Sequence, residues 1–152
     1  MNRLTNPLLI ILLLSLLSAC ANVLSGEECP VTEAVWVKPP ADPAVQDPPA
    51  YGYYFVNEDN SIWASAWWAE AKEPLRFSKE GIKVGWFRPA GVELAITGQR
   101  LDAEAPPLEA EAGNGYPTRF QASSLYFPSE GCWEVTATAE DRELSFVVWV
   151  EP

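Results

Sequence analysis

Apolar side chains recur at every second position in several short segments of this chain. The clearest case is the segment 143–150, where four apolar side chains follow this period: Leu144, Phe146, Val148 and Val150. A period of two places side chains on one face of a β-strand. A Pro-Ser-Glu-Gly turn and an Ala-Glu-Asp-Arg turn bound the segment before it. We therefore expect the last two segments to form the closing strand pair of an antiparallel sheet.

The same pattern predicts further strands upstream. They cover residues 31–38, 51–56, 62–68, 81–87, 92–98 and 119–127. The polar turn 57–61 predicts that the strands on either side of it pair as a hairpin. The turn 88–91, Arg-Pro-Ala-Gly, has Pro and Gly where a tight turn places them, so we expect a second hairpin from 81–87 and 92–98.

The segments between these strands contain no long helical pattern. Residues 39–49 are rich in Pro, which cannot donate to a strand ladder, and we expect an extended crossing between strands there. Residues 69–80 are polar and predict at most one helical turn, while 101–118 predicts a long loop. About eight short strands at regular spacing indicate a single antiparallel β-sandwich of about seven to nine strands.

The N-terminus has the pattern of a secretory signal. One positive charge at Arg3 is followed by an apolar run over residues 8–17 and by small residues. A membrane-spanning helix needs about 20 apolar residues, so this run is too short to be one.

The residues Leu17-Ser18-Ala19-Cys20 resemble the lipobox of bacterial lipoproteins. That resemblance implies a diacylglyceryl group on the Cys20 thiol, cleavage before this residue and acylation of the new amino terminus. Two or three acyl chains hold a protein stably on a bilayer. We thus expect a signal peptide (1–19), a lipidated Cys20 with a short tether (20–30) and one domain (31–152), anchored at the extracytoplasmic face of the cell membrane. The alternative is an ordinary signal peptide that is cleaved a few residues later, with Cys20 incidental.

The net charge of the chain restricts the kinds of molecule that it can bind. Without residues 1–19 the chain keeps 9 basic and 21 acidic residues, a net charge of −12. Binding of nucleic acid requires a basic surface that neutralises phosphates. We therefore expect a membrane attachment through Cys20 and no nucleic-acid partner.

Two further cysteines remain, Cys29 near the start of the domain and Cys132 in the penultimate strand. Thiol pairs outside the cytoplasm are expected to oxidise, which predicts a Cys29–Cys132 disulfide. Two buried free thiols are the alternative.

The composition offers little catalytic chemistry. The sequence has no His, and its only Met is the initiator. This removes the commonest general base and the commonest transition-metal ligand. We expect no catalytic residues, no metal site and no cofactor. A carboxylate pair would suffice for glycoside hydrolysis, so an anchored hydrolase stays as an alternative.

The aromatic residues give the best candidate for a binding site. Trp63 and Trp67 are expected on one face of the 62–68 strand and Trp68 on the other, so one set would point outward and could stack on a glycan, peptidoglycan or protein ligand. The alternative is that one set fills the core and the other is covered by 39–49 or 69–80. Four other tryptophans are expected to pack in the interior: Trp36, Trp86, Trp133 and Trp149. Arg88 and Arg100 are expected to pair with neighbouring carboxylates.

The segment Leu125–Val135 and the final alternating strand resemble the immunoglobulin-like modules of bacterial surface lipoproteins. The resemblance implies an immunoglobulin-like β-sandwich. Together these features favour a lipid-anchored, non-catalytic binding or structural module of the cell envelope. An accessory subunit of an envelope protein assembly is a further alternative.

Overall fold

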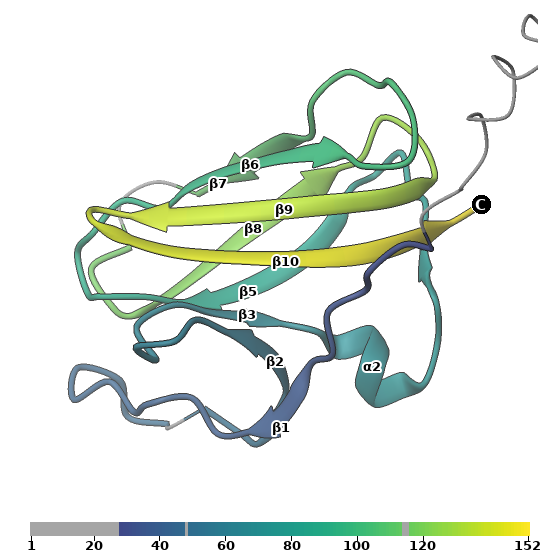
Figure 1. Ribbon diagram of the computed structural model, residues 1–152. Coiled ribbons are helices and arrows are strands. Elements are labelled where there is room, and N and C mark those ends of the chain that lie inside the picture. The colour runs from purple at the N-terminus through teal and green to yellow at the C-terminus, as the bar shows by residue number, and fades with distance from the viewer. Residues whose placement is uncertain (1–27, 48, 114–115) are drawn as a thin grey trace, which may run out of the picture.

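Two β-sheets pack face to face around one core (Figure 1). The computed structural model describes residues 28–47, 49–113 and 116–152, so the predicted signal peptide (1–19) and Cys20 lie outside the described residues. The larger sheet has the order β1 (Val35–Val37), β2 (Gly52–Val56), β3 (Trp63–Ser65), β5 (Ile82–Phe87), β8 (Phe120–Tyr126) and β7 (Glu109–Ala112). The smaller has the order β4 (Leu75–Arg76), β10 (Arg142–Glu151), β9 (Gly131–Ala139) and β6 (Ala95–Arg100).

This architecture confirms the predicted all-β sandwich. The described part of the chain contains ten strands, slightly more than expected, because the short strands β4 and β7 lie in segments that were predicted to be irregular. The strand pairs are antiparallel except for β4 and β10, which run parallel. A single short helix, α2 (Trp67–Ala71), interrupts the strands in this part.

The closing hairpin of β9 and β10 supplies much of the core. The four alternating side chains of β10 are all buried, at 4% exposure or less: Leu144, Phe146, Val148 and Val150. Phe146 stacks on Phe55 of the opposite sheet with ring centroids 4.1 Å apart, and its ring lies 6.2 Å from that of Trp86. The period of two therefore identified the face of β10 that packs against the larger sheet.

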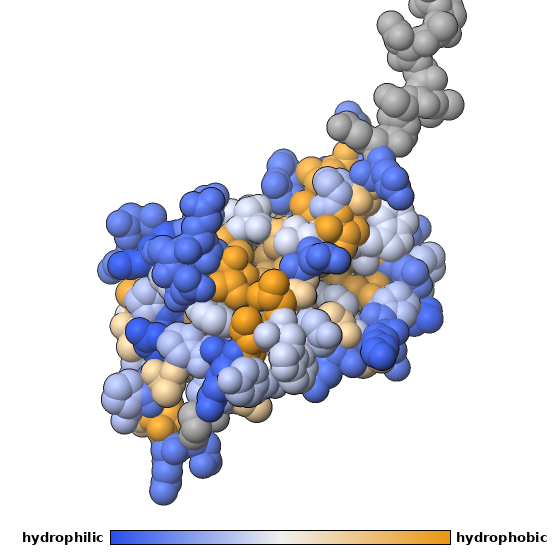
Figure 2. All heavy atoms as spheres, turned by 60° about the horizontal axis from the view of Figure 1, so that its bottom comes forward, coloured by the Kyte–Doolittle hydropathy of each residue, from blue (hydrophilic) through white to orange (hydrophobic). Residues whose placement is uncertain are grey.

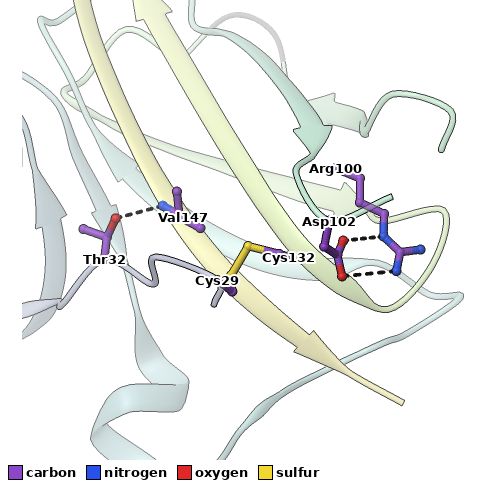
Figure 3. Close-up of a disulfide and its surroundings, with 6 residues drawn as sticks. All are labelled: Cys29, Thr32, Arg100, Asp102, Cys132 and Val147. Atoms are coloured by element: carbon purple, nitrogen blue, oxygen red, sulfur yellow. Dashed lines mark hydrogen bonds and ion pairs between the residues drawn. A yellow bond between two sulfur atoms is a disulfide. The ribbon is translucent and has the colours of Figure 1, made fainter. Parts of the chain in front are cut away.

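A disulfide and two hydrogen bonds hold the start of the domain on the smaller sheet; Figure 3 shows the disulfide and one of the two hydrogen bonds. Cys29 and Cys132 are joined, with Cα atoms 5.6 Å apart, which confirms the predicted pairing. Close by, the Thr32 N–H donates to the Val147 carbonyl and the Val147 N–H donates to Thr32 Oγ1, both at 2.9 Å. The N-terminal end of the described chain is thereby held beside the start of β9.

The prediction that the segments 81–87 and 92–98 pair as a hairpin around residues 88–91 is wrong. β5 belongs to the larger sheet and β6 to the smaller, where β6 pairs with β9. The chain turns at Gly91, whose φ is 72°, and crosses the edge of the sandwich while Leu94 enters the core. The two segments share a period of two because they face one core from opposite sheets.

The strand predicted over residues 62–68 is also too long. β3 ends at Ser65, and the buried Ala66 donates its N–H to the Tyr53 carbonyl at 2.8 Å. The chain then forms α2, which ends at Lys72 in the left-handed conformation. The predicted pairing with the 51–56 strand is confirmed, since β2 and β3 are antiparallel neighbours.

Candidate functional site

A groove with an aromatic floor lies where the 39–49 crossing meets the ends of β5 and β8. It has a volume of about 370 Å³. One wall comes from the crossing, and the floor and the other wall come from β5, β8 and the residues just before β8. We call it the aromatic groove, defined by its lining residues: Asp42, Val45, Asp47, Pro49, Phe87, Tyr116, Thr118 and Phe120.

The floor is part of an aromatic row on the outer face of the larger sheet. Phe87 lies directly opposite Phe120 in the β5–β8 register and opposite Trp63 in the β3–β5 register. The Phe87 and Phe120 rings meet edge to face, with centroids 5.5 Å apart. Each also meets a tyrosine ring edge to face: Phe87 meets Tyr54 at 6.0 Å, and Phe120 meets Tyr116 at 6.4 Å. Phe120 keeps 40% of its surface exposed, so the row is open to solvent at this end.

Arg88 fixes the wall of the groove that contains Tyr116 and Thr118 by hydrogen bonds to their carbonyls. Its side chain is only 3% exposed. Its Nε donates to Gln121 Oε1 at 3.0 Å, its Nη1 to the carbonyls of Thr118 and Pro89 at 2.7 and 2.8 Å, and its Nη2 to the Tyr116 carbonyl at 3.1 Å. Burial lowers the pKa of Arg88, but a guanidinium remains charged at neutral pH. The prediction that Arg88 pairs with a carboxylate is thus wrong: backbone carbonyls and an amide satisfy it.

Asp42 ties the opposite wall to the same strand. One carboxylate oxygen accepts the Ala44 N–H at 2.8 Å, and the other accepts the Arg119 N–H. These two hydrogen bonds hold the pKa of Asp42 below its usual value. The carboxylate is therefore ionised at neutral pH, and it fixes the crossing against the start of β8.

The aromatic groove lies at the end of the sandwich opposite the start of the described chain. Phe87 ends β5 and Phe120 begins β8, whereas Cys132 lies at the beginning of β9. Figure 1 shows the ends of β5 and β9 at one extremity of the sheets and the N-terminal end, α2 and the C-terminus at the other.

The three tryptophans predicted as possible ligand-binding residues do not lie on one strand: Trp63 is in β3, and Trp67 and Trp68 are in α2. Trp63 is 7% exposed, and its Nε1 donates to the Asn60 carbonyl at 3.0 Å. Trp67 begins α2 and is 49% exposed, with its Nε1 donating to the Lys83 carbonyl at 2.9 Å. Trp68 packs against the core and meets the Trp67 ring edge to face at 5.7 Å. The expectation that Trp63 and Trp67 share a strand face is wrong because the strand ends before Trp67.

The other tryptophans divide into two pairs. Trp86 and Trp133 are fully buried, as predicted, but Trp36 and Trp149 are 51% and 45% exposed. The predicted ion pair of Arg100 is confirmed: its Nε lies 2.7 Å from an Asp102 carboxylate oxygen (Figure 3).

The aromatic groove itself was missed in the sequence, although a signal for it exists. Phe87 is out of phase with the buried positions Ile82, Val84 and Trp86, and Phe120 is out of phase with Leu125. An aromatic residue on the otherwise polar face of a strand indicates an outward contact. The 39–49 crossing lies against this contact, a placement that the periodicity does not encode.

Residues 28–47, 49–113 and 116–152 contain no group of three or more His, Cys, Asp or Glu side chains placed to hold a metal ion. Within the same ranges, no helix combines the length and apolar character required to cross a bilayer.

Comparison with known proteins gives this chain no family: no protein-family model, no curated protein sequence and no solved structure matches it.

Proposed function

We propose that this chain is a lipid-anchored, non-catalytic module at the extracytoplasmic face of the cell membrane that binds a ligand in the aromatic groove. The single observation that carries the proposal is the groove itself, which combines solvent-accessible aromatic rings with two clamped walls. Exposed apolar surface of this kind marks binding sites, and walls that are held before binding lower the entropy lost on association.

The anchor and the groove fit one orientation. Eight residues separate Cys20 from Cys29, and a chain of this length spans at most about 30 Å. The disulfide holds the start of the domain at one end of the sandwich, whereas the aromatic groove lies at the other. A lipid on Cys20 would therefore keep the domain close to the bilayer with the groove directed away from it.

The lowered pKa of Asp42 favours ligand binding over glycoside hydrolysis as the function of the aromatic groove. A glycosidase of the two-carboxylate type requires one carboxyl with a raised pKa to act as general acid. In the aromatic groove the pKa of Asp42 is shifted in the opposite direction, and both its oxygens already accept backbone N–H groups. This geometry suits a fixed negative charge better than a proton donor.

The second candidate function is that of an accessory subunit of an envelope assembly. β1 is an edge strand of the larger sheet, and its Val35 and Trp36 are about half exposed, as are Val31 and Trp149. Figure 2 shows apolar residues gathered near the N-terminal end of the described chain and in the middle of the same face. Co-purification of a stoichiometric partner from detergent-solubilised membranes, lost in a Trp36→Ala variant, would support this function.

The lipid anchor is tested by replacing Cys20 with Ser. Without the thiol there is no acceptor for the diacylglyceryl group, so we expect the Cys20→Ser protein to move from the membrane fraction to the soluble fraction. Mass spectrometry of the wild-type protein should show the acyl groups. A Cys20→Ser protein that stays in the membrane fraction would contradict the proposal.

The binding site is tested with a screen of glycans, peptidoglycan fragments and peptides against the purified full chain in a nonionic polyoxyethylene detergent. We expect a ligand whose binding is lost in a Phe120→Ala variant. Trp36→Ala is the matched control, because it also removes a half-exposed aromatic ring but lies on β1. Equal loss in both variants, or none in Phe120→Ala, would exclude the aromatic groove as the site.

A further inference from the structure

We infer that the ligand of the aromatic groove is a basic side chain, the guanidinium or ammonium group of an Arg or Lys on a partner polypeptide. The inference rests on the proposed function, since it names the chemistry of the ligand for the same groove. Three features of the groove carry it: its charge, the arrangement of its rings, and its size together with its apolar wall.

The charge of the groove is negative. Asp42 and Asp47 both line it, and no basic side chain is among the described residues that do so. Two guanidinium groups lie near the groove without lining it: that of Arg88 donates to the carbonyls of Tyr116, Thr118 and Pro89, and the charge of Arg119 helps to lower the pKa of Asp42. Asp42 is held in place by backbone N–H groups, and Asp47 is exposed. Because Arg119 partly offsets the charge of Asp42, Asp47 is the accessible counter-ion that a cation entering the groove would meet.

The aromatic rings form a corner instead of a flat platform. The planes of Phe87 and Phe120 cross at 62°, and those of Tyr116 and Phe120 cross at 76°. A sugar ring stacks best on a single flat surface, which crossed rings do not offer. A cation is attracted to the face of each ring around it, so crossed rings beside carboxylates favour a positive group.

The dimensions and walls of the groove suit a side chain with an apolar stem. A volume of about 370 Å³ is at the lower end of the range for small-molecule sites, roughly 300–1,000 Å³. Val45 and Pro49 line the same wall as the carboxylates. The methylenes of an Arg or Lys can pack on this apolar surface while the charged head reaches Asp47. A free amino acid would bring its own carboxylate to the acidic wall, whereas a side chain within a polypeptide would not.

The test is a binding titration by fluorescence anisotropy with the full chain in nonionic detergent. The probe is a labelled acetyl-Ala-Leu-Arg-Leu-Ala-amide peptide, compared with the same peptide carrying citrulline, the neutral isostere of arginine. We expect the citrulline peptide to bind about tenfold more weakly. Binding of the arginine peptide should also weaken as salt is raised, because the counter-ion Asp47 is exposed.

Variants then locate the binding. Asp47→Asn should weaken binding of the arginine peptide by about three- to tenfold, and Phe120→Ala should weaken it further. Glu143→Gln is the matched control, because it makes the same change of charge on β10 of the other sheet and should leave binding unchanged. Asp47→Asn alters an exposed side chain, so it remains informative if Phe120→Ala fails to fold by circular dichroism.

The outcomes separate this inference from the proposed function. Equal binding of the arginine and citrulline peptides, or an Asp47→Asn variant that binds like the wild type, would overturn the inference. If a neutral glycan or peptide then binds and Phe120→Ala removes it, the aromatic groove remains the binding site and only the cation is wrong. If no probe responds to Phe120→Ala, the proposed function fails as well.

Discussion

Two charged residues hold the aromatic groove in shape from opposite sides. Arg88 draws the carbonyls of Tyr116 and Thr118 toward β5, and Asp42 accepts the N–H of Arg119. The burial of Arg88 makes its hydrogen-bond partners costly to leave unpaired. The segment before β8 is thus fixed by contacts with residues about 30 to 77 positions earlier in the chain.

Replacing Asp42 by Asn should change how stability depends on pH. The N–H groups of Ala44 and Arg119 favour the ionised carboxylate, so its pKa is lower in the folded protein than in the unfolded chain. The unfolded chain therefore takes up the proton first, and this contribution to stability is present above about pH 4 and is lost as pH falls through the folded pKa. We expect Asp42→Asn to flatten the fall in unfolding free energy below pH 4 in urea titrations.

The flattening will be partial, because the pKa values of Asp59 and Asp102 are also lowered by hydrogen bonds in the folded state. Asp47→Asn is the control for removing one charge from the same wall. If Asp42→Asn and Asp47→Asn gave identical acid profiles, the two backbone hydrogen bonds of Asp42 would not be stabilising.

Single residues also show what periodicity can and cannot predict. Trp86 and Trp133 lie in phase with buried neighbours on β5 and β9, so their burial followed from the sequence. The environment of Arg88 did not, because three of its four partners are backbone carbonyls, which carry no sequence signal. Trp36 lies on β1, which among the described residues is an edge strand of the larger sheet, and alternation alone does not distinguish an edge strand from a central one.

At the scale of elements, the sequence predicted most of the strands but not the sheet to which each belongs. The period of two is the same whether two strands pair directly or belong to opposite sheets around one core. β5 and β6 belong to opposite sheets, so the turn residues between them were mistaken for a hairpin. The position of the groove also depends on which sheet each segment joins. Its floor is on the outer face of the larger sheet, and one wall comes from the 39–49 crossing.

The connection between β8 and β9 provides a test at this scale. Gly131 has a φ of 131°, and a Cβ there would lie 2.6 Å from Arg100 Nε. Gly131→Ala should therefore add backbone strain and displace the flexible Arg100 side chain from Asp102, and we expect a loss of about 1–3 kcal/mol in denaturant unfolding. The strain acts where β9 begins, next to Cys132.

Gly91→Ala is the matched control for this substitution. Gly91 also has a positive φ, 72°, but a Cβ there would meet nothing within 4 Å. Strain alone should then cost about 1–2 kcal/mol. If the two variants lost the same stability, displacement of Arg100 would contribute nothing at Gly131.

At the scale of the whole molecule, the two ends of the sandwich have different roles. One end carries the disulfide and the N-terminal end of the described chain, and the other carries the aromatic groove. The core between them is continuous from Leu75 near the first end to Phe55, Trp86 and Phe146. The groove is thereby supported by a rigid double sheet and lies far from the segment that would lead to the membrane.

The disulfide should contribute a large share of the stability of this arrangement. Cys29 and Cys132 are 103 residues apart, and closing a loop of this length restricts the unfolded chain by about 4–5 kcal/mol in the chain-entropy model. We expect Cys132→Ser to lower the melting temperature under oxidising conditions, and a reductant to lower that of the wild type to a similar value without further affecting the variant. Cys29→Ser should behave in the same way, because either substitution opens the same loop. A Cys132→Ser variant that lost equal stability with and without reductant, relative to the wild type, would show that the packing of the buried side chain matters and the covalent link does not.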